Sequence, residues 1–203
     1  METMLADHKR ILIRQKKEWG EILTGFETRN RYVLMTEAGD ELGFAAEEGG
    51  GMGKAIGRQM LGAARACKIH IYNADGDAVG HGDKPFRWFF YEMACFEDGQ
   101  QIGRIQRRFR LLGRRFTIYD ANDQEILTVD SPFFKIWTFN VLAGQKHVAK
   151  ISKKWSGLLK EAFTDADTFG VEFQRDTHPD VKKLLVIATF LVDFCCFENN
   201  NKR

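Results

Sequence analysis

The chain has 203 residues, of which 44% are hydrophobic and 29% are charged, and these proportions exclude a disordered or fibrous protein. Its 30 Lys and Arg residues nearly balance its 28 Asp and Glu residues, so the chain as a whole is not a polyelectrolyte. The length predicts a single domain over residues 1–203, and the 17 Phe residues predict a bulky core.

The N-terminal segment, Met1 to Leu12, mixes charged residues with single apolar ones and lacks the continuous apolar stretch of a secretory signal. We expect residues 1–8 to be frayed. The four cysteines show no CxxC spacing, and their number is low for a secreted disulfide scaffold. The sequence therefore predicts reduced thiols in a cytoplasmic protein that is not secreted.

Most of the chain consists of short runs with alternating apolar and polar residues, which is typical of strands. Three segments, 32–45, 68–79 and 116–129, repeat the order strand, acidic turn, strand. Asp, Asn and Gly tolerate the left-handed backbone that tight hairpins require. The pattern predicts an antiparallel meander rather than parallel strands joined by helices.

Residues 48–66 interrupt this pattern and are rich in glycine, so we expect a flexible loop with a helical turn near residues 56–66. Residues 49–54 (GGGMGK) invite comparison with a phosphate-binding P-loop. That motif fails here, because Glu48 stands where its first Gly is needed and Ala55 follows the lysine where Ser or Thr is needed.

An aromatic run, Trp88 to Tyr91, has too many consecutive rings for all of them to point inward from one strand. One interpretation makes Trp88, Phe89 and Phe90 membrane contacts, seated at the level of the lipid headgroups. The other, which we favour at this point, divides the run between the core and a neighbouring loop.

The basic stretch Gly103 to Phe116 is predicted to be a strand with Arg104, Arg108 and Arg110 on its outer face. Its other face then carries Arg107 together with the apolar residues Ile105, Phe109 and Leu111. One guanidinium group can donate two parallel hydrogen bonds to two oxygens of a phosphate. The candidate lipid- or phosphate-binding residues are therefore Arg104, Arg108, Arg110, Arg114 and Arg115. A solvated face paired with carboxylates is the alternative, and nucleic-acid binding is a minor one.

The acidic segment 165–176 (DADTFGVEFQRD) partly fits a calcium loop. Asp165, Asp167 and Asp176 match positions 1, 3 and 12 of an EF-hand loop, but Phe169 at position 5 offers no side-chain oxygen. The alternation of Phe169, Val171 and Phe173 instead favours an acidic turn followed by a core strand. A weak calcium site remains the second interpretation.

Residues 184–197 form the only strongly apolar run, which is shorter than the roughly 20 residues of a membrane span and contains Asp193. We predict a helix beginning near Pro179, apolar on every face and hence enclosed by protein. Its predicted buried residues are Leu184, Ile187, Phe190, Leu191 and Phe194, and Asp193 is expected to pair with a residue of the surrounding wall. Residues 199–203 are expected to be frayed.

These elements predict an all-β fold with one buried helix, in which a closed antiparallel sheet surrounds the C-terminal helix. The five histidines are scattered singly, and no nucleophile or metal-ligand spacing recurs. The sequence therefore does not predict an enzyme.

Several segments resemble the phospholipid scramblase family, which is related to the tubby-like and LURP-one-related barrels. They are residues 23–32 (LTGFETRNRY), 44–48 (FAAEE), 150–173 (KISKKWSGLLKEAFTDADTFGVEF) and 191–198 (LVDFCCFE). The resemblance implies a barrel of twelve antiparallel strands around a hydrophobic C-terminal helix. It also implies binding to membrane phospholipids, or their calcium-dependent movement between leaflets. The expected partner is an anionic phospholipid or phosphoinositide surface on the cytoplasmic face of a membrane, and protein partners are possible.

The chain differs from that family at two places. It starts almost directly at the first strand, without the Pro-rich extension that family members often carry, and residues 85–95 contain one cysteine where many members have a palmitoylated cluster. We therefore do not expect a lipid anchor. The alternative function is a soluble, non-enzymatic barrel that binds phosphoinositides or a partner and does not move lipids.

Overall fold

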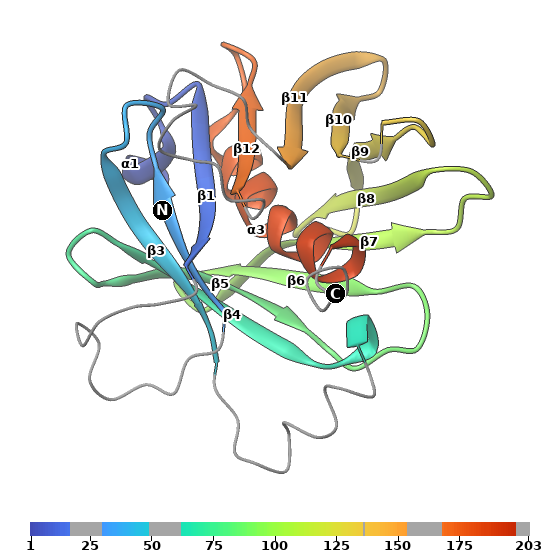
Figure 1. Ribbon diagram of the computed structural model, residues 1–203, viewed down its shortest axis with the longest axis horizontal. Helices are drawn as coiled ribbons and strands as arrows, with labels where there is room; N and C mark the ends of the chain where they lie inside the picture. The colour runs from blue at the N-terminus through green and yellow to red at the C-terminus, as the bar shows by residue number, and fades with distance from the viewer. Residues whose placement is uncertain (17–29, 49–61, 136, 154–167, 198–203) are drawn as a thin grey trace.

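The computed structural model describes residues 1–16, 30–48, 62–135, 137–153 and 168–197 (Figure 1). The short helix α1 (Glu2–Leu5) comes first and the helix α3 (Pro179–Cys196) last, with a 3-10 turn η1 (Gly62–Ala64) between them. The strands are β1 (Arg10–Lys16), β2 (Arg31–Met35), β3 (Glu41–Glu47), β4 (Cys67–Asn73), β5 (Ala78–Lys84), β6 (Glu92–Glu97), β7 (Gln100–Arg108), β8 (Arg114–Asp120), β9 (Glu125–Ser131), β10 (Thr138–Ala143), β11 (Lys146–Lys153) and β12 (Thr168–Phe173).

Twelve strands, all within the described ranges, close into an antiparallel barrel, which confirms the predicted fold class (Figure 1). Each strand pairs with its neighbours in the sequence, and β1 closes the ring against β12, where Ile11 lies opposite Val171. Closure gives every strand two hydrogen-bonded neighbours and therefore leaves no exposed sheet edge.

Helix α3 occupies the barrel interior. Pro179 stands in its first turn, and the imidazole of His178 accepts a hydrogen bond from the backbone N–H of Asp180 at 3.3 Å. The five residues predicted to be buried in this helix are each no more than 2% exposed: Leu184, Ile187, Phe190, Leu191 and Phe194. Because strands surround the helix, an apolar surface on every face is what burial requires.

Two wall glycines, Gly82 and Gly103, allow α3 to approach the strands closely. A Cβ at Gly103 would lie 2.9 Å from a methyl carbon of Leu184 and 2.4 Å from the backbone oxygen of Tyr119. A side chain therefore cannot be added there without moving the helix or the neighbouring strand.

Within the described ranges, no helix is both long enough and apolar enough to cross a membrane.

The prediction that residues 1–8 are frayed is wrong. Leu5 of α1 is fully buried in the core. The ammonium group of Lys182 in α3 donates hydrogen bonds to the backbone oxygens of Leu5 at 3.2 Å, Ala6 at 2.6 Å and His8 at 3.1 Å. One buried cation thus satisfies carbonyl groups at and beyond the end of α1 and ties the N-terminal segment to the central helix.

Two other predicted segments fall largely outside the described residues. The tail 199–203 does so completely, and the predicted loop 48–66 is described only at Glu48 and from Gly62 onward. Its last part forms η1, followed by Arg65, whose buried guanidinium pairs with Glu47 of β3.

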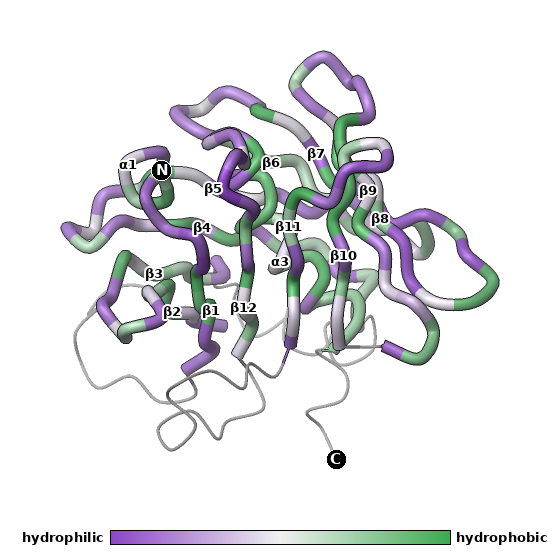
Figure 2. The backbone as a smooth tube through the Cα atoms, turned by 90° about the horizontal axis from the view of Figure 1, so that it is seen from above, coloured by the Kyte–Doolittle hydropathy of each residue, from purple (hydrophilic) through white to green (hydrophobic). Residues whose placement is uncertain are grey.

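The barrel has two chemically different ends. Because successive strands are antiparallel, the connections that follow odd-numbered strands share one end, and those that follow even-numbered strands share the other. We call the end with the connections of the first kind the loop end. Its described connections are 85–91, 109–113, and 132–135 with 137. Figure 2 shows hydrophobic stretches in the connections beside β8 at this end.

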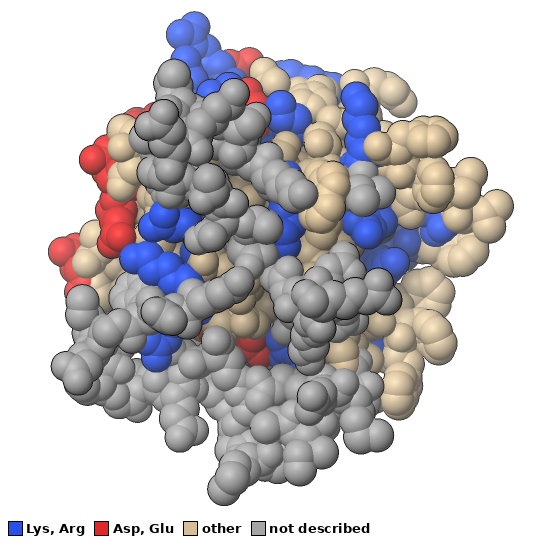
Figure 3. Space-filling view, in the orientation of Figure 1, with Lys and Arg blue, Asp and Glu red and all other residues tan. Residues whose placement is uncertain are grey.

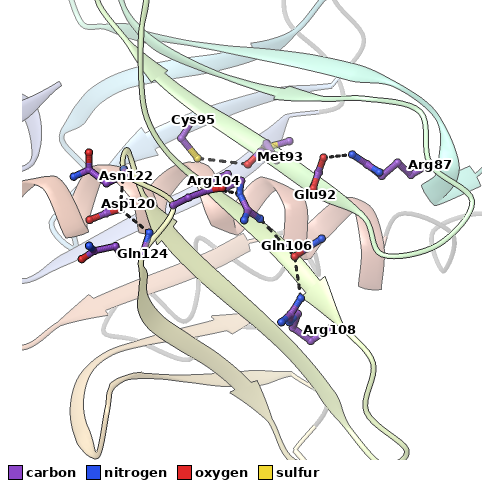
Figure 4. A network of polar contacts seen from close by, with 11 residues as sticks. Arg87, Glu92, Met93, Cys95, Arg104, Gln106, Arg108, Asp120, Asn122 and Gln124 are labelled. Atoms are coloured by element: carbon purple, nitrogen blue, oxygen red, sulfur yellow. Dashed lines mark hydrogen bonds and ion pairs between the residues drawn. The ribbon is translucent and has the colours of Figure 1, made fainter.

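The opposite end, the turn end, consists of tight turns, most of which contain Asp or Glu. In one of them, the carboxylate of Asp120 accepts hydrogen bonds from the backbone N–H groups of Asn122 and Gln124, both at 2.9 Å (Figure 4). Such side-chain bonds stabilise a short turn without apolar contacts. In Figure 3, acidic side chains gather along the left edge, whereas Lys and Arg are spread from the top edge across the centre to the right.

Candidate functional site

Large apolar side chains are exposed at the loop end. Within the described part of the chain, every strongly exposed large hydrophobic residue lies in one of its three connections: Phe86, Trp88, Phe89, Phe90, Phe109, Leu111, Leu112, Phe133 and Phe134. We call these nine residues the apolar rim. The exposed fraction reaches 77% for Phe89 and 92% for Phe134. A soluble surface rarely gathers apolar residues in this way unless they contact a partner or a membrane.

The aromatic run between β5 and β6 lies on the surface. The run divides as the favoured interpretation predicted: Tyr91 packs partly against the core, whereas Trp88, Phe89 and Phe90 lie in the connection between the two strands and are all more than half exposed. Phe90 also adopts φ +53°, in the left-handed region that bulky residues rarely occupy. Such backbone strain is typically found at functional sites.

The predicted strand face that pairs Ile105 with Phe109 and Leu111 is correct only for its first part. Strand β7 ends at Arg108, and the chain then enters the connection 109–113. Ile105 is therefore buried, whereas Phe109 and Leu111 project into solvent. The continuous alternation hid the end of the strand, because the connection carries no Pro and has its Gly only at position 113.

The candidate phosphate-binding arginines divide into two groups. Arg104, in the middle of β7, donates a hydrogen bond to Asp123 at 2.8 Å and lies 3.8 Å from the ring centroid of Tyr119. Burial opposes the charge of Arg104, but the hydrogen bond to Asp123 and the nearby negative charges together outweigh it and raise the pKa of this guanidinium. Arg104 and Arg108 also approach Gln106 from either side, at 3.5 and 3.1 Å (Figure 4). The predicted alternative, pairing with carboxylates, thus describes Arg104.

Arg110 and Arg115 share one carboxylate, that of Asp130 at the end of β9. Arg110 forms an ion pair with it, and the Nε atom of Arg115 lies 3.2 Å from the same oxygen. Two cations on one anion leave a net positive charge at this place.

The second group consists of Arg108, Arg110 and Arg114. These three arginines line a cleft of about 290 Å³ between the connections 85–91 and 109–113. Its lining residues are Trp88, Phe89, Phe90, Tyr91, Arg107, Arg108, Phe109, Arg110, Gly113 and Arg114. Arg107 was not among the predicted site residues, since strand alternation placed it on the inner face. At the barrel mouth that inner face opens into the cleft, where the guanidinium of Arg107 lies 5.7 Å from the ring of Tyr91.

The described part of the predicted calcium segment does not form an EF-hand loop. Residues 168–173 are strand β12, with Phe169, Val171 and Phe173 buried, as the alternative interpretation predicted. A strand of this length holds its ends about 17 Å apart, too far for one ion. Asp176 is exposed, 3.9 Å from Lys146, and Asp165 and Asp167 lie outside the described residues. Calcium binding by these two stays a prediction.

Asp193 pairs with the barrel wall, as predicted. Its carboxylate accepts a hydrogen bond from the Tyr32 hydroxyl at 3.0 Å and lies 3.3 Å from the ammonium group of Lys153. All three side chains are buried. Because a buried charge is costly without its partners, these contacts favour one position of α3 within the barrel.

Burial makes three of the four thiols poor nucleophiles. Burial raises the pKa of the Cys95 and Cys195 thiols far above the ordinary range, and that of Cys196 to about 11. All four cysteines are free of disulfide bonds. Within the described ranges, no three His, Cys, Asp or Glu side chains form a group that could hold a metal ion.

Comparison with known proteins gives a consistent set of relatives. The family model described as Scramblase matches residues 1–199. Phospholipid scramblase 1 of Homo sapiens is 31% identical over 98% of this chain and 66% of its own length. Phospholipid scramblase 2 of Bos taurus is 30% identical over 96% of this chain and 70% of its own length. The chain spans 66%, 62% and 61% of the human, mouse and rat Phospholipid scramblase 1.

A solved structure agrees in fold. The X-ray structure of a protein from Arabidopsis thaliana aligns over 100% of this chain and 97% of its own chain. The TM-score is 0.52, and the sequence identity is 13%. At this identity the likeness extends to the fold alone.

Proposed function

The chain belongs to the Scramblase family, and from this premise we propose that it is a phospholipid scramblase-like protein that docks on phospholipid membranes through its loop end. The proposed role is non-enzymatic. The observation that carries it is the apolar rim, whose exposed side chains all lie at the end of the barrel that also carries the arginine-lined cleft.

The rim supplies the apolar part of membrane binding. Trp and Phe side chains are favourable at a membrane interface, and three neighbouring connections at one end of the barrel carry them. Docking removes from water the apolar area that the folded barrel leaves exposed, and this is the main favourable term in interfacial binding.

The arginines supply the electrostatic part. Each basic residue near an anionic leaflet contributes about 1 kcal/mol. Arg107, Arg108, Arg110 and Arg114 lie between the apolar connections, so rim insertion would bring them to the depth of the phosphate groups. Stable peripheral attachment usually takes two signals, and this surface combines an apolar one with a cationic one. The cytoplasmic leaflet, rich in anionic lipids, is the membrane face it fits best.

Burial of α3 favours a second candidate function, in which the protein binds lipids and does not move them. Helix α3 lies inside the barrel, where its apolar side chains pack in one cluster with those of the strands. A protein in this state would bind phosphoinositides or other anionic lipids without transferring them between leaflets. Calcium-dependent movement would need a change at the bilayer surface or a different position of α3.

Sedimentation of the full chain with vesicles tests docking. The vesicles contain phosphatidylcholine alone, with phosphatidylserine, or with phosphatidylinositol 4,5-bisphosphate, each with calcium and with a chelator. We expect strong binding to both anionic compositions, weaker binding to the neutral one, and a decrease at high salt. Equal binding to neutral and anionic vesicles, or no binding, would contradict the proposal.

A leaflet-exchange measurement separates the two candidate functions. The full chain is reconstituted into vesicles carrying a fluorescent phospholipid in both leaflets, and a membrane-impermeant quencher then reports its exchange. Exchange that requires calcium supports scrambling by this chain. Docking without exchange, at saturating calcium, supports the binding function.

A further inference from the structure

The cleft at the loop end has an unusual charge balance. Four of its lining residues are arginines and none is Asp or Glu. Cations brought this close repel one another unless an anion lies between them. The remaining walls are aromatic, so the cleft has few neutral polar groups that could disperse the charge.

Internal carboxylates compensate this charge only in part. Arg107 contacts the ring of Tyr91, and Arg108 bonds to the neutral side chain of Gln106; neither lies within ion-pair distance of a carboxylate among the described residues. Arg110 does have a carboxylate partner, Asp130, but shares it with Arg115. The charge of Arg107 and Arg108 is thus available to a ligand.

The backbone at Gly113, which lines the cleft, passes close to the neighbouring connection. Gly113 adopts φ +89°, and a Cβ there would lie 2.4 Å from the backbone oxygen of Ser131. This glycine therefore lets the end of the 109–113 connection pass against the start of the 132–137 connection. Phe90, whose φ is +53°, lines the cleft from the connection 85–91.

We propose that this cleft binds a phosphomonoester group carried by a membrane lipid headgroup. The inference rests on the proposed function and names the ligand class of the same surface. A phosphomonoester carries a charge of about −1.5 to −2 at pH 7 and three acceptor oxygens, which suits several guanidinium groups better than a singly charged diester. A phosphoinositide with ring phosphates has this chemistry, whereas phosphatidylserine has only the diester.

Size and position agree with a headgroup ligand. A volume of about 290 Å³ lies at the lower limit of ligand clefts, which is about 300 Å³, so it admits a headgroup but not a whole lipid. Phe89 and Phe109 line the cleft and also belong to the apolar rim. A headgroup bound there would keep its glycerol and acyl chains at the level of the rim, in the bilayer.

Calorimetric titration of the full chain with soluble headgroups tests the inference. The probes are glycerophosphoinositol 4,5-bisphosphate, which has two monoesters, glycerophosphoserine, which has only a diester, and inorganic phosphate. We expect the first to bind at least tenfold more tightly than either of the others. Equal binding of glycerophosphoserine would overturn the monoester assignment, and equal binding of inorganic phosphate would overturn the headgroup assignment.

A matched pair of variants locates the site. R107Q/R108Q removes two cleft charges, and R10Q/R104Q removes two charges from arginines that lie outside the cleft and pair with carboxylates. We expect the first variant to bind glycerophosphoinositol 4,5-bisphosphate at least tenfold more weakly and the second to change less than twofold. Equal losses would show general electrostatic attraction and overturn the inference. Circular dichroism verifies that both variants fold.

Vesicle sedimentation of the same variants distinguishes failure of this inference from failure of the proposed function. If the wild-type chain sediments with anionic vesicles but binds no soluble headgroup, the result supports membrane docking and overturns the assignment of the cleft. If it binds the headgroup but no vesicle, docking falls and the cleft remains a phosphate site. R107Q/R108Q should lose its preference for phosphoinositide vesicles while retaining binding through the rim.

Discussion

Replacing Phe89 and Phe134 by alanine is expected to weaken vesicle binding about 100-fold and to leave the free energy of unfolding unchanged. The two side chains lie in different connections of the loop end and are 77% and 92% exposed. Both effects follow from that exposure, because contacts that are absent from the folded barrel cannot stabilise it but remain available to a membrane.

The magnitude follows from the exposed area. A Phe side chain presents on the order of 200 Å², so the two together expose roughly 330 Å². Alanine retains about a third of this, and an interfacial side chain is buried on about half of its surface, which leaves about 110 Å² lost from docking. At about 25 cal/mol per Å², this is about 3 kcal/mol, or about 100-fold in the dissociation constant.

The assay is sedimentation with phosphatidylcholine–phosphatidylserine vesicles over a range of lipid concentrations, with thermal unfolding of the same samples. Phe96→Ala is the matched control, since Phe96 is a half-exposed ring on the outer wall, stacked on His81 at 4.6 Å and outside the rim. It should bind vesicles like the wild type. A loss below about threefold for the double variant, or an equal loss for the control, would refute the assignment of the rim.

Three further predictions concern the barrel itself. Lys182→Met removes the three hydrogen bonds that join α3 to the N-terminal segment, and should cost about 2–4 kcal/mol in the free energy of unfolding, measured with denaturant. Gly103→Ala places a methyl group against α3 and should cost about 1–3 kcal/mol; a neutral result would show that the helix can shift freely. Burial opposes ionisation of Glu172, but hydrogen bonds from Arg10 and Lys150 outweigh it and lower its pKa below the ordinary 4.5. The Glu172 carboxylate therefore adds to the free energy of unfolding above pH 4.5, and this contribution is lost as the pH falls through the lowered pKa. The difference in free energy of unfolding between the wild type and Glu172→Gln should be constant near neutrality and shrink in acid.

The fold could be predicted because its signals are local. Alternating apolar residues, acidic turns and a helix apolar on every face each specify their own element, and a closed sheet is the arrangement that buries such a helix. Asp193 could be expected to have partners, since a buried carboxylate needs them. Tyr32 and Lys153 could not be identified as those partners, because 161 and 40 residues separate them from it in the sequence.

The candidate site was harder to predict, because the exact ends of the strands decide which of its side chains are exposed. The alternation of Ile105, Arg107 and Phe109 reads as one continuous face, yet the strand ends at Arg108 and the last residue of the three is exposed. Arg107 was overlooked for the same reason: an inward position in the middle of a strand means burial, whereas at the mouth of a barrel it means access to a cleft.

The sequence by itself determined the elements of this protein, the burial of its C-terminal helix and the presence of aromatic and basic segments. Only the tertiary structure decided that these segments meet. Closure of the antiparallel ring places alternate connections at the same end, and it thereby gathers the apolar rim and the arginine cleft from residues 86–134 onto one surface. Part of the charge that nearly cancels over the whole chain is separated in space, because the acidic turns follow even-numbered strands and the cleft arginines flank a connection that follows an odd-numbered one.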